Sequence, residues 1–157
     1  MTTAGSVAER RPRGYWLAIF TERTWQEFRA AGADVVGFPT LRLGAAQKIP
    51  TGDWLLCYVT VVHRWVGVLE VTTKAFVDKS PIWSTATFPV RVRTKALILR
   101  DVPEGVPIGP MRRQLSVFAG LRSANNWGSK VRIAPTRWPE EDGILVAQMV
   151  MGAAFTR

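Results

Sequence analysis

Cysteine and histidine are almost absent from this chain of 157 residues, which has one of each, Cys57 and His63. A single cysteine cannot form an internal disulfide, and one cysteine with one histidine cannot complete the ligand set of a zinc site. Long apolar runs are missing too, since no segment approaches the roughly 20 residues that span a bilayer. Residues 1–13 lack the apolar core of a secretory signal. We therefore expect a cytoplasmic protein.

Acidic residues are scarce: 12 Asp and Glu stand against 21 Lys and Arg, which leaves a net charge of +9. From Gly105 to Pro139 there is no acidic residue, whereas this segment carries Arg112, Arg113, Arg122, Lys130, Arg132 and Arg137. A positive field of this kind favours a polyanionic partner, and nucleic acid is the first candidate. A basic surface that only keeps the protein in solution would explain the charge equally well.

Apolar residues are plentiful, at 47% of the chain, and this excludes disorder over most of its length. The length suits one domain. Residues 1–14 are polar and arginine-rich, and we interpret them as a disordered basic arm. The remainder, residues 15–157, is interpreted as a single domain.

Apolar patterning predicts strands at residues 15–20, 54–62, 65–73 and 90–99, and a last short strand at 130–134. The segment 54–62 is apolar on both faces, which is typical of a buried barrel strand. The segment 90–99 alternates, with Arg91, Arg93 and Lys95 on one side. Such a row of cations indicates either a solvated face or a set of phosphate contacts.

The sequence patterns that indicate helices cover only short segments. Thr24 and Glu27 match a capping box, and Gly32 follows where a C-cap glycine belongs. Residues 37–40 are expected to form a loop and residues 111–118 a short helix. Pro139, followed by three acidic residues, opens a last helix. Several strands with short flanking helices predict an α+β fold around a barrel-like sheet.

The residues that commonly carry catalysis are poorly placed. Cys57 lies inside a predicted strand, where a thiol is an inert core residue. His63 has no Ser or Cys near it in sequence to activate. Neither a P-loop nor a dinucleotide-binding glycine pattern is present. We therefore predict a binding protein without a cofactor, not an enzyme.

Tryptophan is abundant, with seven residues at positions 16, 25, 54, 65, 83, 127 and 138. Most should be core residues, because each buries a large apolar area. Exposed aromatic rings in a basic protein can instead stack on nucleobases. Trp83 lies in an irregular segment between Pro81 and Pro89, where a core role is harder to explain.

The order of these segments resembles an EVE domain. The resemblance covers about residues 15–150 and rests on Tyr15-Trp16-Leu17, a helix with Trp25, Gly37-Phe38-Pro39, Gly52-Asp53, Gly67 to Thr72, Pro81-Ile82-Trp83, Phe88 to Val92 and Trp138 to Asp142. EVE domains belong to the PUA-like superfamily and are similar to YTH domains. The resemblance implies a curved, barrel-like mixed β-sheet flanked by short helices. It also implies nucleic-acid binding, with a modified base inserted into an aromatic pocket.

The family pattern transfers to individual positions. Ser80 to Trp83 is similar to the YTH stretch that supplies one aromatic wall of the base pocket. Residues 37–40 resemble the loop that supplies the other wall, but Pro39 stands where YTH domains have tryptophan. Residues 126–132 resemble the region that approaches the phosphate backbone. The candidate pocket residues are Trp16, Phe38, Pro39, Thr40, Tyr58, Trp83, Ser84 and Trp127, and the candidate phosphate contacts are Arg91, Arg93, Lys130 and Arg132.

The sequence thus predicts a non-enzymatic reader of modified DNA, with a modified cytosine such as 5-methylcytosine or 5-hydroxymethylcytosine as the target. EVE domains are associated with restriction and defence. One alternative is an RNA-binding module of the same fold that recognises modified RNA such as N6-methyladenine. A second is a small nucleic-acid-modifying enzyme, such as a glycosylase, that uses His63 or a carboxylate. A third is an interaction module for an acidic protein.

Overall fold

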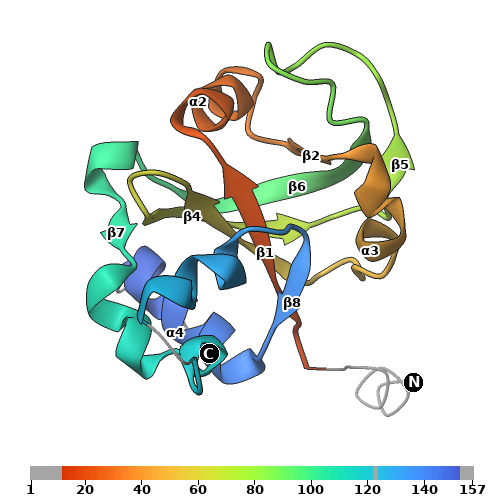
Figure 1. The fold of residues 1–157 in the computed structure, drawn as a ribbon. Coiled ribbons are helices and arrows are strands. Elements are labelled where there is room, and N and C mark those ends of the chain that lie inside the picture. The colour runs from red at the N-terminus through yellow and green to blue at the C-terminus, as the bar shows by residue number, and fades with distance from the viewer. Residues whose placement is uncertain (1–11, 122–123, 153–157) are drawn as a thin grey trace.

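The computed structural model describes residues 12–121 and 124–152, so residues 1–11 of the predicted basic arm lie outside the described residues. Figure 1 shows a strongly curled sheet with helices packed around it. The strands are β1 (Tyr15–Phe20), β2 (Val35–Phe38), β3 (Trp54–Val59), β4 (Arg64–Val71), β5 (Phe76–Val77), β6 (Val90–Leu99), β7 (Val106–Pro107) and β8 (Thr136–Trp138). The main path runs β2-β6-β4-β3-β1-β8, while β5 pairs with β6 and β7 pairs with β4.

The sheet is mixed. Strands β1 and β3 pair in parallel, with Tyr15 opposite Trp54, and the remaining pairs are antiparallel. The crossover from β1 to β3 carries α2 (Glu22–Ala30), β2 and α3 (Leu43–Gln47). The expected α+β class with a barrel-like sheet is therefore confirmed.

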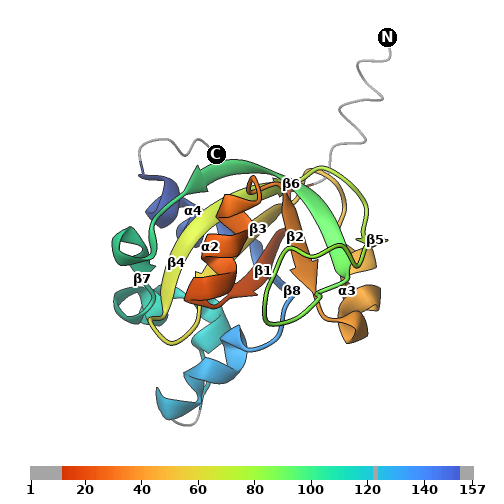
Figure 2. The same ribbon diagram turned by 90° about the horizontal axis from the view of Figure 1, so that it is seen from above.

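Two helices cover opposite faces of the curled sheet (Figure 2). On β1, Trp16, Ala18 and Phe20 point to the α2 side, whereas Tyr15 and Leu17 point to the side of α4 (Glu140–Met151). Strand β3 alternates in the same way, and all six of its residues are buried. The prediction of a strand buried on both faces is confirmed, because each face has its own helix to pack against.

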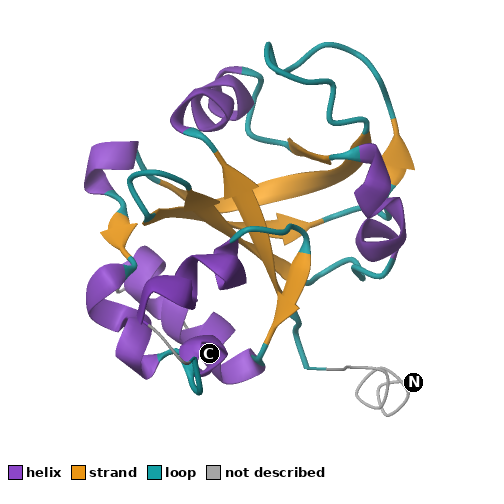
Figure 3. Ribbon diagram, viewed as in Figure 1, coloured by secondary structure: helices purple, strands orange, loops and turns teal. Residues whose placement is uncertain are grey.

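Short 3-10 segments add further helical turns, most of them in the C-terminal half, and Figure 3 draws them as helices. They are η1 (Thr40–Arg42), η2 (Val102–Glu104), η3 (Gly109–Gln114), η4 (Ser116–Phe118) and η5 (Ala124–Val131). The helix expected at 111–118 is thus two 3-10 segments. No helix in the described part of the chain is long and apolar enough to cross a membrane.

Several local predictions were wrong. The capping box at α2 uses Thr21 and Thr24, because the Thr21 hydroxyl accepts from the Thr24 amide and the Thr24 hydroxyl accepts from the Thr21 amide. Residues 35–38 form β2, since four consecutive pairs with β6 hold them. The last strand is β8, where Trp138 pairs with Tyr15, and not the segment 130–134.

Candidate nucleic-acid interface

A cavity of about 280 Å³ opens where β1, the start of α2 and the end of β2 meet the loop before β6. We call it the first cavity. Its lining residues come from five segments of the chain and are Ile19, Phe20, Thr21, Thr24, Gly37, Phe38, Pro39, Thr60, Thr85, Phe88, Arg132 and Ala134. The volume lies near the lower end of the range for small-molecule pockets, about 300 Å³, and suits one flat ring system.

Three phenylalanines supply the aromatic part of the first cavity: Phe20, Phe38 and Phe88. Phe20 and Phe38 are held by their strands and are buried. Phe88 is half-buried, and its backbone has a φ of 45°, in the left-handed region that non-glycine residues rarely occupy. Such a conformation costs about 1–3 kcal/mol and is commonly found at binding sites.

Trp83 forms a second layer behind this wall. Its ring packs edge-on against Phe88 with centroids 5.6 Å apart, and it is 7% exposed. A Cβ atom added to Gly37 would lie 2.6 Å from the Trp83 ring, so β2 approaches Trp83 only because residue 37 is glycine. Trp83 therefore supports the cavity and is not among the residues that line it.

The loop that carries Trp83 and Phe88 is held at both sides. Arg91 is 1% exposed, and its guanidinium donates to the carbonyl oxygens of Ser80, Thr87 and Phe88 and to the Ser80 hydroxyl. At the other side, the Ser84 amide donates to the Glu27 carboxylate of α2. This loop is therefore well defined although it has no regular secondary structure.

The buried position of Arg91 does not agree with the phosphate contact expected of it. Its donors are used by the loop, and its guanidinium lies 5.4 Å from the centre of the Trp83 ring. Arg93, two residues along β6, is exposed and lies over Phe76. The alternating pattern of β6 correctly predicted that Arg91 and Arg93 lie on the same side of the strand. The loop that carries Trp83 covers Arg91 and leaves Arg93 exposed.

The polar groups of the first cavity are hydroxyls and one cation. Thr21 and Thr24 sit at the positive end of α2, and Thr60 and Thr85 lie on other segments. Arg132 is exposed at the rim, and Ala134 lies two residues further along the same segment. Hydroxyls can donate and accept, so these groups suit the edge of a base, and the guanidinium suits a phosphate.

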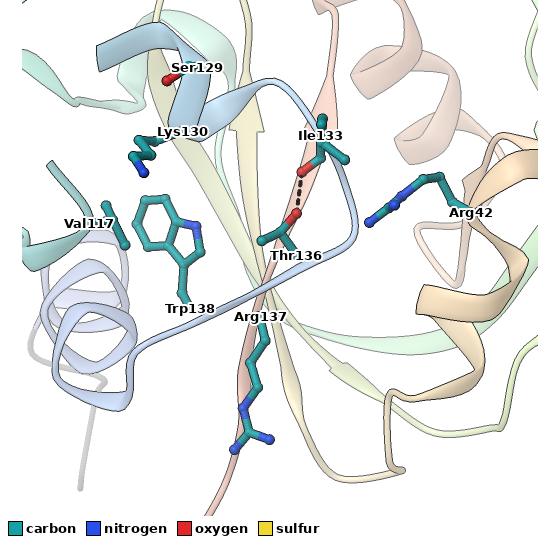
Figure 4. A pocket seen from close by; sticks show the side chains of 8 residues that line it. All are labelled: Arg42, Val117, Ser129, Lys130, Ile133, Thr136, Arg137 and Trp138. Atoms are coloured by element: carbon teal, nitrogen blue, oxygen red, sulfur yellow. Dashed lines mark hydrogen bonds between the residues drawn. The ribbon is translucent and has the colours of Figure 1, made fainter. Parts of the chain in front are cut away.

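Two further cavities adjoin the first one. The second cavity, of about 480 Å³, is lined by Arg42, Val117, Ser129, Lys130, Ile133, Thr136, Arg137 and Trp138 (Figure 4). The third, of about 400 Å³, is lined by Pro39, Thr40, Lys79, Ala86, Thr87, Phe88 and Pro89. Pro39 and Phe88 are shared with the first cavity. None of the described residues that line these cavities is Asp or Glu, so the combined surface is strongly cationic.

The structure places the predicted site residues in three kinds of position: in the lining of a cavity, in the loop that supports the first cavity, and elsewhere in the fold. Phe38, Pro39 and Arg132 line the first cavity, Pro39 and Thr40 line the third, and Lys130 lines the second. Trp83 and Ser84 belong to the supporting loop. The other three aromatic candidates, Trp16, Tyr58 and Trp127, lie elsewhere.

Trp16 is buried on the α2 side of β1, and its indole N–H donates to Asp53 at 2.9 Å. Tyr58 is fully buried on the α4 side of β3, and its hydroxyl lies 2.6 Å from Nδ1 of His63. Burial raises the pKa of Tyr58 above its usual range. Neither ring is available to stack on a base in this conformation.

Trp127 belongs to an aromatic cluster around the turn between β3 and β4. Its ring is edge-on to His63 at 4.8 Å and to Phe118 at 6.2 Å, and the Arg112 guanidinium lies 4.7 Å from its centre. We call Tyr58, His63, Arg112, Phe118 and Trp127 the aromatic cluster. Its members pack on one another, so Trp127 is partly covered.

Sequence reasoning missed Phe20, Thr21, Thr24 and Phe88 as cavity residues. Phe20 was assigned to a strand and Thr24 to a helix cap, and both assignments are correct as far as they go. The sequence signal that could have identified these cavity residues is that the end of a strand and the start of a helix meet at residues 20–24. Phe88 stands next to Pro89, which marked a strand entrance and not a pocket wall.

Cys57 and His63, the two side chains considered above for catalysis, line none of the three cavities. Burial raises the pKa of the Cys57 thiol well above its usual value, so it is protonated at neutral pH. His63 is hydrogen-bonded to Tyr58 and lies in the aromatic cluster, not in any of the three cavities. The described residues contain no group of three or more His, Cys, Asp or Glu side chains that could hold a metal ion.

No protein-family model and no curated protein matches this sequence. Solved structures do match. The Pho92 YTH domain in complex with m6A is 12% identical, has a TM-score of 0.68, and the match covers 92% of this chain and 87% of that one. The YTH domain of Zygosaccharomyces rouxii MRB1, in complex with N6-methyladenosine RNA, is also 12% identical, with a TM-score of 0.63 and coverage of 89% and 88%.

A bacterial protein has a similar fold. Protein Atu2648 from Agrobacterium tumefaciens is 17% identical, with a TM-score of 0.59, and the match covers 91% of this chain and 96% of that one. Identities this low establish the fold alone. The chain therefore has an α+β, PUA-like fold with the curled half-barrel sheet that YTH domains also have.

Proposed function

We propose that this protein is a non-enzymatic reader of modified nucleic acid, and that the first cavity receives one extruded base. The observation that carries the proposal is a base-sized cavity with aromatic walls, set inside a surface whose lining has cations and no carboxylates. Extrusion of a base costs a few kcal/mol in a duplex. Stacking on an aromatic wall returns about 1–3 kcal/mol per base, and phosphate contacts add affinity without sequence preference.

The modified base is proposed to be a cytosine derivative in DNA, such as 5-methylcytosine or 5-hydroxymethylcytosine. The first cavity is large enough for one base. Phe20, Phe38 and Phe88 provide apolar contact for a methyl group, and Thr60 or Thr85 can bond the edge of the base. One buried methyl or methylene is worth about 1–3 kcal/mol of discrimination.

Arg132, at the rim, and Lys130, in the second cavity, are the phosphate contacts that this arrangement favours. Both are exposed and lie two residues apart on the segment that separates the two cavities. Arg93 is exposed on β6 and remains a candidate. A lost phosphate contact should lower affinity on every sequence and reduce the slope of log K against log salt by about 1.

Modified RNA is the second candidate target. It is favoured by the YTH domains of similar fold, whose structures contain m6A or N6-methyladenosine RNA. Against methyladenine stands Pro39, which lines the first cavity at the position where, by the resemblance, YTH domains have tryptophan. A preference for RNA over matched DNA would point to contacts with the 2′-hydroxyl.

Binding of matched oligonucleotides tests the proposal. DNA and RNA strands would carry cytosine, 5-methylcytosine, 5-hydroxymethylcytosine, adenine or N6-methyladenine at one position, and Kd would be measured at two salt concentrations. We expect one modified cytosine in DNA to bind several-fold more tightly. Phe88→Ala should weaken binding of the modified strand by about tenfold and abolish that preference, because about 1–3 kcal/mol of stacking is lost.

Phe76→Ala is the matched control. Phe76 is a half-buried aromatic residue on β5 that lines none of the three cavities. It should leave the ratio of modified to unmodified affinity unchanged. Equal binding of all the oligonucleotides by the wild type would refute the reader function, and release of a free base during incubation would refute the non-enzymatic assignment.

A further inference from the structure

Two apolar side chains protrude beside the cavities. Leu41 of η1 is 94% exposed and Ile133 is 55% exposed. Single exposed apolar residues are common on protein surfaces. What sets Leu41 and Ile133 apart from other exposed apolar residues is that they stand next to residues that line the cavities.

Leu41 and Ile133 each stand next to residues that line two of the cavities. Leu41 stands between Thr40, which lines the third cavity, and Arg42, which lines the second. Ile133 lines the second cavity and stands between Arg132 and Ala134, which line the first. We call these two exposed apolar side chains, with the turn and the segment that carry them, the apolar ridge.

Hydrogen bonds join the two halves of this ridge. The Arg42 amide donates to the Pro39 carbonyl at 2.9 Å, which closes the 3-10 turn that carries Leu41. The Arg42 guanidinium donates from Nε to the Ala134 carbonyl at 3.2 Å and from Nη2 to the Pro135 carbonyl at 2.6 Å. Figure 4 shows Arg42 reaching toward the segment that carries Ile133. Leu41 is thus a protrusion on a fixed turn that leads directly into α3.

Each of the cavities beside the apolar ridge has a cation in its lining. Lys79 lines the third cavity, Arg132 the first, and Lys130 and Arg137 the second. An apolar ridge between cationic walls matches a duplex, in which stacked bases lie between two phosphate backbones. Proteins that unstack DNA insert Leu, Ile, Met, Phe or Pro side chains between base steps.

We propose that Leu41, assisted by Ile133, enters the base stack of a duplex and occupies the space vacated when the target base moves into the first cavity. The inference deepens the proposed function and rests on it, because it specifies double-stranded nucleic acid as the target. The wedge offsets part of the cost of unstacking the duplex. A single strand has no stack to refill, so Leu41 should matter little for it.

The experiment compares duplex and single-stranded DNA that carry the same modified cytosine, with the wild type, Leu41→Ala and Ile133→Ala. We expect Leu41→Ala to weaken duplex binding by about tenfold, since it removes the wedge that offsets part of the cost of unstacking. Ile133→Ala should have a smaller effect of the same kind. Single-strand binding should change less than twofold in both variants. Met149→Ala is the matched control, because Met149 is an exposed apolar residue on α4, outside the cavities.

A second readout follows the base stack directly. 2-Aminopurine placed next to the modified cytosine should brighten when wild-type protein binds the duplex, and this increase should be reduced in Leu41→Ala. Equal losses on duplex and single strand, or no loss on either, would overturn the wedge. The wild-type preference for the modified single strand tests the reader function separately, so that each hypothesis can fail without the other.

Discussion

The first cavity and the aromatic cluster around Trp127 are built from the same kinds of residue and have different outcomes. Both place aromatic rings against an arginine, Arg91 beside Trp83 and Arg112 beside Trp127. In the aromatic cluster, His63 and Phe118 pack edge-on to Trp127 and cover it. At the first cavity, Trp83 packs behind Phe88, and the space in front of Phe88 stays open. Aromatic and basic composition is therefore no guide to a pocket unless the packing partners are known.

The two arginines should differ most in their effect on stability. Arg91→Ala leaves several carbonyl groups of the loop without a donor, and a loss of about 3 kcal/mol of unfolding free energy is expected from bonds to a buried charged group. Arg112→Ala removes a cation–π contact and should cost about 1 kcal/mol. Urea denaturation of both variants provides the measurement. Equal losses in the two would show that Arg91 does not hold the loop.

The two tryptophans should differ in binding. Trp83→Ala removes the support behind Phe88, so the preference for a modified base should fall several-fold. Trp127→Ala should keep that preference, because the ring packs on His63, Phe118 and Arg112. Affinity ratios for modified and unmodified oligonucleotides, measured on folded protein as judged by circular dichroism, make this comparison. A loss of preference in Trp127→Ala alone would reverse the assignment of the two regions.

The smallest expected effect concerns acid pH. The hydrogen bond from the Ser80 amide lowers the pKa of Asp78, with smaller contributions from the Ser80 side chain, Arg91 and Arg93. A carboxyl group with a lowered folded-state pKa stabilises the fold above its unfolded-state pKa, and this contribution is lost as pH falls below about 4. Asp78→Asn should therefore lower the melting temperature slightly at pH 7 and by less at pH 3. A deficit of equal size at both pH values would contradict this origin.

Much of the fold could be predicted from periodicity. Strands β1 and β6 have the predicted bounds, and β3 is buried on both faces, because alternation along a strand reports directly which side chains enter the core. Predictions made from one short signal were less reliable. The capping box was placed three residues too late, because Thr24 with Glu27 matches the usual pattern, whereas in the structure Thr24 itself takes the place of that glutamate, three residues after Thr21.

The candidate site was predictable only in part. Phe38, Pro39, Thr40, Lys130 and Arg132 line the cavities, whereas Trp16 and Tyr58 are buried in the two cores. Composition, charge and strand period are local properties of the chain, and they determine an α+β protein with a cationic C-terminal half. The open space in front of Phe88, the burial of Arg91 and the exposure of Leu41 depend on contacts between segments far apart in sequence. These contacts exist only once the sheet has curled and β2, the loop before β6 and the segment at 132–135 have come together.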